Sequence, residues 1–308
     1  QFEQLRMQGV LDQHQNASRA VRTIPVVVHV VLPSNLQSTV TDAQIQQMVN
    51  YMTEDFRLLN PSYASQTRTY FKQFAKDAEI EFCLAKRDPN GAATTGITRT
   101  NTTVSCYNPD TNPNDMKTTN GGGKAPWQQT KYLNIWIVDL CGSSTSGTAG
   151  YAYLPTTGVV GNYIDGIVLD YQLGFGSGSR AASHEAGHYL GLGHTWGELS
   201  SNACGNVFPD TDDGFSDTPD SKGPNFGCSA VTSCSNNSPS GDMLENIMDY
   251  SSCPTMFTTQ QANFMNLVLN GGPFSSPFNT YGFASRASLV TNNSGCVTTG
   301  APIADFTA

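Results

Sequence analysis

Continuous apolar runs along the chain predict the strands of a sheet. Residues 24–32 read IPVVVHVVL, and a β-branched run without polar alternation is typical of a central strand covered on both faces. His29 lies inside this run, so we expect it to be a hydrogen-bonded core histidine. Four further strand candidates follow, at residues 79–85, 133–138, 150–154 and 166–170. The third of these is short and comes after a polar tract, which suits the edge of a sheet.

Two helices follow from apolar positions that recur at helical spacing. Residues 41–58 carry such a stripe behind Thr41 and Gln44, which match a capping box. Residues 258–270 repeat the arrangement behind Thr258 and Gln261, and a glycine pair then ends the helix. Between these helices, residues 88–129 are rich in Pro, Gly, Asn and Thr, which predicts a long surface excursion. The segment that follows residue 194 has few apolar runs, so we expect little regular structure there.

A dense histidine motif lies between the predicted strands and the irregular C-terminal part. Residues 184–194 read HEAGHYLGLGH and hold three of the five histidines. His184 and His188 are four positions apart, so on a helix both imidazoles face the same side. Gly191 is expected to end that helix in the left-handed conformation, which lets His194 return from another direction. Three imidazoles leave one position of a tetrahedral zinc open, as in catalytic sites.

Glu185 follows the first histidine directly and can reach a zinc-activated water without ligating the ion. Zinc lowers the pKa of such a water to about 7. Glu185 would accept its proton as general base and pass it to the leaving amine of a peptide bond. A bare H-E-x-x-H occurs on ordinary helices, but the full pattern over eleven residues is specific.

Composition places this site in an extracellular setting. Only 13% of residues are charged, and the chain is rich in Gly, Ser, Thr and Asn. The net charge of −9 argues against nucleic acid and anionic membranes as partners, and no run of 18 apolar residues could span a bilayer. Eight cysteines without a C-x-x-C pair fit four disulfides in an oxidising compartment. We expect a secreted protein whose leader has been removed or omitted from the sequence.

An acidic cluster lies in the irregular segment after the motif. Five aspartates fall within eleven residues, namely Asp210, Asp212, Asp213, Asp217 and Asp220. Carboxylates at this density repel one another unless water or a cation neutralises them. Calcium takes several oxygen ligands from irregular loops, so a structural Ca²⁺ site is one interpretation, although the spacing is not that of an EF-hand. A solvated acidic loop is the other.

The histidine motif together with NIMDYS at 246–251 resembles the metzincin metallopeptidases, in which a methionine-containing turn lies beneath the zinc. A longer stretch of sequence resembles the pappalysin family: HEAGHYLGLGHTW, then a Cys/Asp-rich loop, then NIMDYSSC. TIPVVVHVV, NYMTEDFRLLN and IEFCLA extend this resemblance over roughly residues 23–270. The three histidines match the family's zinc ligands, and the glutamate matches its general base.

The resemblance also assigns roles outside the histidine motif. Met248 matches the methionine of the turn, and Tyr250 matches a tyrosine that can approach the zinc and stabilise the reaction intermediate. Two disulfides are implied, joining Cys204 to Cys234 and Cys228 to Cys253. No pairing is implied for the remaining cysteines, which are Cys83, Cys106, Cys141 and Cys296.

Two departures from the family pattern concern specificity and latency. Some relatives favour Arg or Lys after the cut, using an aspartate shortly beyond the tyrosine of the turn. Here the segment is shorter and reads Ser251, Ser252, Cys253, without an acid. Relatives can also carry a zinc-blocking cysteine in a pro-segment, whereas residues 1–82 contain no cysteine.

The expected fold is α+β and metzincin-like, with a twisted five-stranded mixed sheet and two long helices above the zinc cleft. An irregular, disulfide-braced C-terminal subdomain completes it. Residues 1–22 are expected to be a pro-segment remnant or arm. Residues 23–300 form the catalytic domain, with an upper subdomain to 194 and a lower one from 195. The closing stretch 301–308 resembles the opening strand of a PKD-type domain.

These features predict a secreted zinc endopeptidase that acts on proteins or peptides. An extended substrate would pair with the edge strand through main-chain hydrogen bonds, at Tyr151, Ala152, Tyr153 and Leu154. The alternative is a secreted calcium-dependent adhesion or carbohydrate-binding domain that uses the acidic cluster. The intact Glu185 favours the enzyme, because a binding module needs no base beside three histidines.

Overall fold

The computed structural model describes residues 20–141, 147–176, 178–198, 204–205, 207–208, 210–237, 239–274, 282–291 and 295–296. The expected N-terminal arm, apart from residues 20–22, lies outside this part of the chain. The expected PKD-like stretch at 301–308 lies outside it as well.

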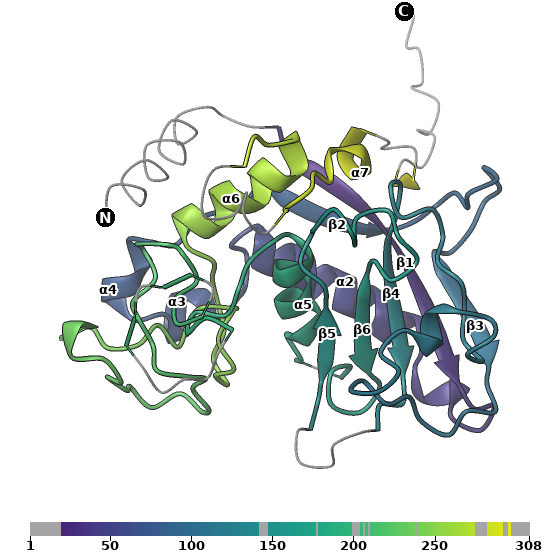
Figure 1. The fold of residues 1–308 in the computed structure, drawn as a ribbon, viewed down its shortest axis with the longest axis horizontal. Helices are drawn as coiled ribbons and strands as arrows, with labels where there is room; N and C mark the ends of the chain where they lie inside the picture. Colours follow the sequence, from purple (N-terminus) through teal and green to yellow (C-terminus); the bar gives the residue numbers. More distant parts are fainter. Residues whose placement is uncertain are drawn as a thin grey trace, which may run out of the picture.

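A mixed sheet organises the N-terminal part of the protein (Figure 1). Its strands run in the order β2 (Ile80–Leu84), β1 (Arg22–Leu32), β4 (Leu133–Val138), β6 (Ile167–Asp170), β5 (Gly150–Ala152), and β3 (Ile97–Asn101) also pairs with β1. All pairings are parallel except that of β5 with β6, which is antiparallel. The predicted edge position of β5 is therefore confirmed, although the strand ends at Ala152, two residues earlier than expected.

The strand β3 was not expected from the sequence. β1 is 11 residues long, so its outer edge pairs first with β2, from Arg22 to Val26, and then with β3, from Val28 onward. β3 reads ITRTN and is only partly buried, so it lacks the apolar run that reveals a central strand. It lies inside the segment 88–129 that the composition marks as a surface excursion.

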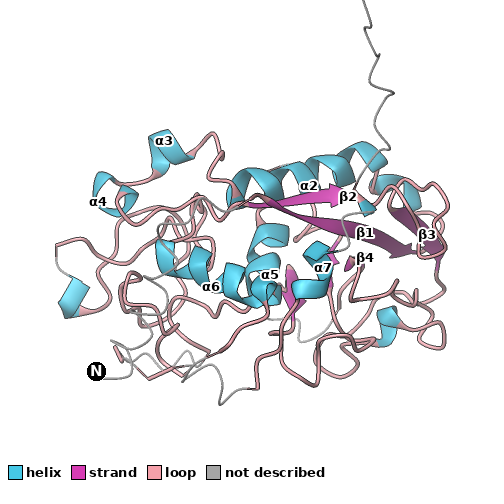
Figure 2. Ribbon diagram, turned by 90° about the horizontal axis from the view of Figure 1, so that it is seen from above, coloured by secondary structure: helices cyan, strands magenta, loops and turns pink. Residues whose placement is uncertain are grey.

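Among the helices, α2, α5 and α7 contact strands of the sheet, and α6 packs beside α7. They are α2 (Asp42–Phe56), α3 (Tyr63–Gln66), α4 (Thr69–Lys72), α5 (Ala181–Tyr189), α6 (Thr259–Asn270) and α7 (Ala287–Thr291), with 3-10 turns at Gln37–Thr39, Asp115–Lys117 and Ser235–Asn237. Both predicted capping boxes are present at the starts of α2 and α6. Figure 2 shows α2 lying along β2 and β1.

The two faces of the sheet bury different sets of side chains. Ile24, Val26, Val28 and Val30 of β1 pack with α2, α5 and α6 in the largest core cluster. The opposite face packs Val31 against Trp136 of β4 and against residues of the segment 88–129. His29 is fully buried and hydrogen-bonds with Thr98 and Asn134, as expected for a core histidine. A strand covered on both faces explains the unbroken apolar run.

Three disulfides brace the described residues. They join Cys83 to Cys296, Cys106 to Cys141 and Cys204 to Cys234, so the last of these agrees with the implied pairing. The implied bond between Cys228 and Cys253 is not formed; both residues are free cysteines, and their thiols are in hydrogen-bond contact. Burial, followed by the hydrogen bond with Cys228, raises the pKa of the Cys253 thiol to about 12.

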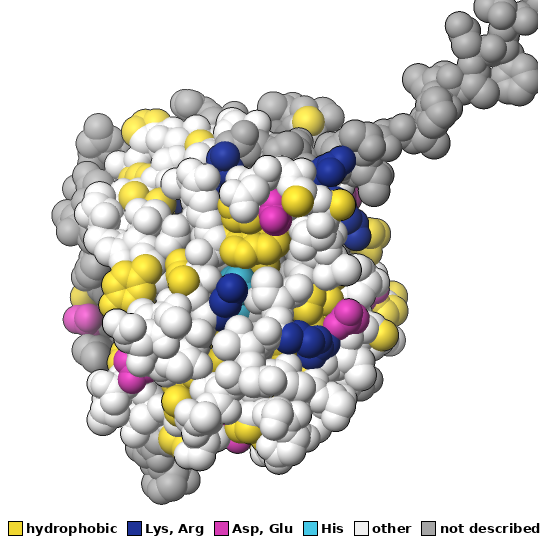
Figure 3. Space-filling view, turned by 90° about the vertical axis from the view of Figure 1, so that its right-hand side faces the viewer, with side chains coloured by type: hydrophobic (Ala, Val, Ile, Leu, Met, Phe, Trp, Pro, Cys, Tyr) yellow, Lys and Arg dark blue, Asp and Glu magenta, His cyan; other side chains and the backbone are white. Residues whose placement is uncertain are grey.

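The surface agrees with the low charge of the sequence. Figure 3 looks onto the β3 side of the molecule, where lysine and arginine side chains lie among acidic ones. The described side chains of this face form no broad patch of a single charge. Among the described helices, none combines the length and the apolar character needed to cross a membrane.

Candidate metal centre and active-site cleft

The three histidines of the motif converge on one point. His188 Nε2 lies 3.1 Å from His184 Nε2 and 3.1 Å from His194 Nε2. One ring nitrogen from each of the three residues falls within 4.8 Å of the others. α5 presents the first two, and Gly191, with a φ of 97°, turns the chain so that the third returns. The expected geometry of the motif is therefore present.

Backbone carbonyls hold two of the imidazoles in a single tautomer. His184 Nδ1 lies 2.7 Å from the carbonyl oxygen of Ile247, and His188 Nδ1 lies 2.7 Å from that of Leu192. A carbonyl oxygen only accepts, so both Nδ1 atoms carry the proton and both Nε2 lone pairs face inward. Burial lowers the pKa of His184 to about 3 and of His188 to about 4, so both rings are neutral. Inward-facing lone pairs without protons fit a divalent metal ion.

The third histidine is oriented by side chains instead. Trp196 stacks on His194 with ring centroids 4.4 Å apart and an interplanar angle of 6°. Glu198 Oε2 lies 4.0 Å from His194 Nδ1, and the Tyr250 hydroxyl lies 3.1 Å from His194 Nε2. Neither Trp196 nor Glu198 was singled out from the sequence. The sequence feature that could have pointed to Glu198 is its position four residues after His194.

Glu185 is a buried carboxylate with an unused oxygen. Its side chain is buried, and its Oε2 atom has no hydrogen-bond partner among the described residues. Burial raises the pKa of Glu185 to about 8, and a hydrogen bond from the backbone N–H of Ala152 partly opposes the shift. A cation near this carboxylate would favour its charged form. One carboxylate oxygen of Glu185 thus has no protein partner, and it lies beside the histidines, where a general base needs to be.

Met248 packs directly beneath the histidine helix. Its side chain is fully buried. A Cβ atom on Gly187 would lie 2.3 Å from Met248 Sδ, so a larger residue at this helix position would force the Met248 side chain to shift. Asn246 shapes the turn, since its Oδ1 accepts from the Met248 N–H at 2.9 Å. The turn therefore supports α5 from below.

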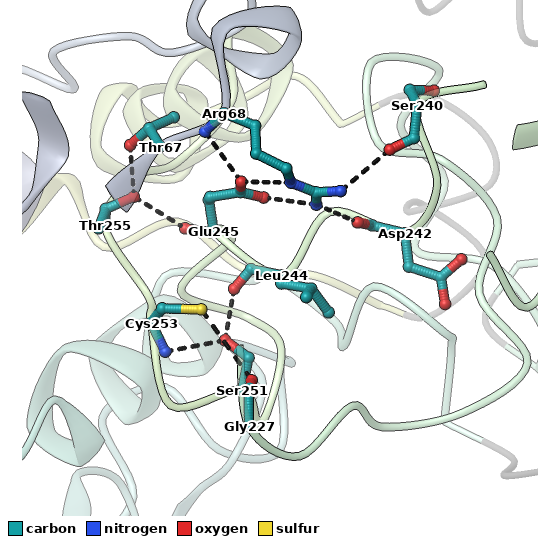
Figure 4. A network of polar contacts seen from close by, with 10 residues as sticks. All are labelled: Thr67, Arg68, Gly227, Ser240, Asp242, Leu244, Glu245, Ser251, Cys253 and Thr255. Atoms are coloured by element: carbon teal, nitrogen blue, oxygen red, sulfur yellow. Dashed lines mark hydrogen bonds and ion pairs between the residues drawn. The ribbon is translucent and has the colours of Figure 1, made fainter. Parts of the chain in front are cut away.

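A polar network anchors this turn to the segment after α2 (Figure 4). Arg68 Nε lies 2.6 Å from Glu245 Oε1, and its Nη2 lies 2.8 Å from Glu245 Oε2, which makes a bidentate pair. The same guanidinium donates to the carbonyl oxygens of Ser240 and Asp242. After the turn, the N–H of Thr255 donates a hydrogen bond of 2.8 Å to the carbonyl oxygen of Glu245. Residues on both sides of the turn are thus held at one point.

A cleft of about 660 Å³ opens beside the histidines. His184, Glu185 and Tyr250 line it together with Gly150 at the start of β5. Behind β5, the Tyr153 hydroxyl accepts a hydrogen bond from Asn114 Nδ2 at 3.1 Å, and Tyr151 donates to the carbonyl oxygen of Pro113. The edge strand therefore borders the cleft while its aromatic side chains are anchored on the other face.

The predicted acidic cluster is only partly assembled. Asp213 is buried, and its Oδ2 has no hydrogen-bond partner among the described residues. Asp217 instead caps α6, accepting from Thr258 Oγ1 and the Gln260 N–H at 2.8 Å. Asp210 is exposed. In the described part of the chain, no group of three or more acidic residues converges on one point, so the expected set of calcium ligands is not gathered.

Asp212 lies close to both Asp213 and Asp220, and its carboxyl group is in hydrogen-bond contact with that of Asp220. Burial raises the pKa of Asp212 to about 6. Burial, together with the charge of Asp212, raises the pKa of Asp213 well above its usual value. A half-buried and a buried acid with raised pKa values are a place where a cation would relieve an electrostatic cost.

Comparisons with known proteins agree with this geometry. Residues 118–270 match the profile of a peptidase M43 family described as pregnancy-associated plasma protein-A. An extracellular metalloprotease of Colletotrichum graminicola is 27% identical over 277 residues, which is 82% of this chain and 78% of that protein. Extracellular metalloprotease 1 of Coccidioides posadasii is 34% identical over 148 residues, covering 44% of this chain and 48% of that protein.

A solved structure shares the fold over most of this chain. Mature mirolysin of Tannerella forsythia, in complex with a cleaved peptide, superposes with a TM-score of 0.75 at 33% sequence identity. The match covers 91% of this chain and 100% of the mirolysin chain. The expected metzincin-like fold is thereby confirmed.

Proposed function

Since the chain belongs to the M43 family of metallopeptidases and is a metalloendopeptidase, we propose that its catalytic metal is zinc and its general base is Glu185. His184, His188 and His194 would hold the ion. One observation carries this proposal: three neutral imidazoles converge beside a buried carboxylate oxygen that has no protein partner. A three-histidine site with an open position is typical of catalytic zinc.

The residues of the cleft supply the proton transfers and the orientation. Zinc, when bound, supplies Lewis acidity to a peptide carbonyl and to a water molecule. The free Oε2 atom of Glu185 takes the proton of the attacking water, while the Ala152 N–H holds the carboxylate in place. The same carboxyl group then delivers that proton to the leaving nitrogen. The carbonyls of Ile247 and Leu192 keep two ligand rings from rotating.

Tyr250 is proposed to stabilise the developing oxyanion. Its hydroxyl lies 3.1 Å from His194 Nε2, on the side of the site that faces the cleft. The side chain is 46% exposed, so the ring can move toward a bound substrate. Burial and the nearby charge of Glu185 raise the pKa of Tyr250 to about 12, which keeps the hydroxyl protonated as a donor.

Substrates are proposed to bind as an extended strand along β5. β5 is the outermost strand of the sheet order and borders the cleft through Gly150. An added antiparallel strand would gain main-chain hydrogen bonds without regard to sequence. The cleaved peptide bound in the mirolysin structure supports peptides as the ligand class.

Two further assignments concern the protein outside the cleft. A calcium ion near Asp212 and Asp213 is proposed as a structural cofactor, supported by their raised pKa values and the unpartnered Asp213 Oδ2. Secretion is proposed because the relatives named above are extracellular metalloproteases and because disulfides persist in oxidising compartments.

The test combines metal analysis with a cleavage assay on one sample. Purified protein should contain about one zinc per chain and degrade casein. A zinc chelator should abolish the degradation, and added zinc should restore it. Cleavage that persists after the metal has been removed would refute the proposal.

A further inference from the structure

A buried lysine lies beneath the edge strand β5. Lys117 ends the second of the 3-10 turns and is fully buried. Its Nζ atom lies 5.3 Å from the ring centroid of Trp136 in β4, 5.6 Å from that of Tyr151 and 5.0 Å from that of Tyr153. The same atom donates a hydrogen bond of 2.6 Å to the carbonyl oxygen of Ile164. Three aromatic rings within about 6 Å of one ammonium group attract its positive charge.

The acidic group that acts on Lys117 is already paired with another cation. Both carboxylate oxygens of Asp165 accept from Arg286, at 2.6 and 2.7 Å. Burial lowers the pKa of Lys117 to about 7, and the charge of Asp165 only partly opposes the shift. Burial is also the main cause that raises the pKa of Tyr151, with Asp115 of the lysine's own turn adding to it, so this phenol stays neutral. An ammonium group costs free energy here, whereas an apolar side chain of similar length would not.

Two of the rings around the lysine belong to the segment that holds Glu185. Tyr151 packs on one face of the sheet and Ala152 on the other. The Tyr153 ring lies 6.4 Å from that of Tyr151, so the residues on either side of Ala152 face the lysine. The Ala152 N–H donates to the Glu185 carboxylate, and a Cβ atom on Gly150 would lie 3.3 Å from Glu185 Cγ. The strand thus links the lysine to the proposed general base.

We propose that Lys117 is a positioning residue for catalysis, which acts on Glu185 through β5. Its ammonium group holds the rings of Tyr151 and Tyr153, and the backbone between these rings carries the N–H that orients the carboxylate. Lys117 does not line the cleft, so it affects the reaction through this strand. A small displacement of a catalytic group lowers kcat strongly. This inference rests on the proposed function.

K117M tests the role of the charge, because methionine is uncharged and of similar length. We expect kcat on a peptide substrate to fall by at least about tenfold near pH 6, with a smaller change in KM and an unchanged zinc content. The ratio of kcat for wild type over K117M should then decline toward one as the pH rises from about 7 to about 9, since wild-type Lys117 loses its proton over this range. Titrations of the metal site and of Glu185 are common to both proteins and cancel in the ratio. A lysine that acted only by packing would give a ratio that does not change with pH.

Thermal unfolding shows whether K117M folds and whether the lysine is charged in the folded protein. The folded-state pKa of Lys117, about 7, lies below that of a lysine in the unfolded chain, so its contribution to stability rises as the pH rises from about 7 to about 10. The variant lacks this titration. The Tm of K117M relative to that of the wild type should therefore be higher at pH 6 than at pH 9. An equal difference at both pH values would overturn the buried charge on which the inference depends.

Lys72 provides a matched control away from β5. Its Nζ atom lies 5.9 Å from the Tyr63 ring centroid and donates to the Ala64 carbonyl oxygen at 2.8 Å, and the residue does not line the cleft. K72M removes the same kind of group and should keep the wild-type kcat at each pH.

Tyr153 provides a second test that does not depend on the folding of K117M, since this side chain is only partly buried. Y153L removes one ring from around the ammonium group, whereas Y153F keeps that ring. The kcat of Y153L should be roughly threefold below that of Y153F, the effect expected from losing one cation–π contact.

The outcomes separate this inference from the proposed function. An undiminished kcat in K117M, a ratio of wild type over K117M that is constant with pH, or equal kcat values in Y153L and Y153F would overturn the inference. Chelator-sensitive cleavage by the wild type would preserve the proposed function in each of these cases. A wild type without chelator-sensitive cleavage would overturn both.

Discussion

His184 and Ile247, 63 positions apart in the chain, are joined by a hydrogen bond of 2.7 Å from the imidazole Nδ1 to the backbone carbonyl oxygen. The turn that carries Met248 and Tyr250 therefore orients, on α5, one of the rings proposed as metal ligands. Met248 also packs against Gly187 of the same helix. The two sides of the cleft are thus positioned by each other, and what stabilises the turn should stabilise the metal site.

Arg68→Met tests how the turn is anchored. Glu245 is 2% exposed in its side chain, so removing its partner leaves a buried charge unpaired. We expect a loss of about 3 kcal/mol in the free energy of unfolding, measured by urea denaturation. Arg99→Met breaks an exposed ion pair with Asp42 and should cost less than about 1 kcal/mol. Equal losses in the two variants would contradict the anchoring role.

Tyr250→Phe tests oxyanion stabilisation, because it removes the hydroxyl and keeps the ring contacts with His194 and Trp196. We expect kcat to fall by about a hundredfold, the lower part of the range for losing one such donor. KM, zinc content and Tm should change little. A variant with normal kcat and raised KM would show that the tyrosine only binds the substrate.

N-methylated peptides test the pairing with β5 without altering the protein. Backbone N–H groups of a strand alternate in direction, so methylation at every second residue should interfere. Each lost hydrogen bond is worth about 1 kcal/mol, which corresponds to roughly a fivefold rise in KM. Methylation that acts equally at all positions, or at none, would argue against strand addition.

Asp212→Asn tests the proposed calcium site through its pH dependence. The folded-state pKa of Asp212, about 6, lies above its value in the unfolded chain. The folded state therefore binds the Asp212 proton more tightly than the unfolded chain does. The contribution of Asp212 to the free energy of unfolding declines as the pH rises from about 4 to about 6. In calcium-free protein, the variant should be more stable than wild type by about 2 kcal/mol near pH 7.5 and equally stable near pH 4.

Added calcium should reverse the order of stability of the wild type and the Asp212→Asn variant near neutral pH. Millimolar calcium should raise the Tm of the wild type near neutral pH and raise that of the variant much less, because the variant lacks one ligand charge. Thermal unfolding of both proteins with and without calcium is the measurement. A wild type that is indifferent to calcium would leave Asp212 and Asp213 as neighbouring acids without a structural metal ion.

The elements that carry a strong local pattern were predictable from the sequence. The unbroken run of β1, the two capping boxes and the spacing of His184, His188 and His194 each depend on residues close together in the chain. Such short-range patterns reflect burial on both faces or helical periodicity directly. The histidine motif could therefore be interpreted before any long-range contact was known.

Features that depend on tertiary pairing could not be predicted in this way. β3 exists because β1 extends beyond β2 and offers a free edge, not because ITRTN is a strong strand sequence. Stacking of Trp196 on His194 depends on how the chain turns after Gly191. The acidic residues 210–220 are close in sequence, yet Asp217 is drawn to the N-terminus of α6, away from any common ligand set.

The most direct test of the account is the turnover of Glu185→Ala in zinc-loaded protein, compared with wild type on the same peptide. The imidazoles and their carbonyl partners are untouched by this change, so the variant should bind zinc in the same proportion and keep its Tm. We predict that kcat falls by at least about a thousandfold, because no other described carboxylate that lines the cleft has an unpartnered oxygen. Undiminished proteolysis by the zinc-loaded variant would contradict the assignment of Glu185 as the base.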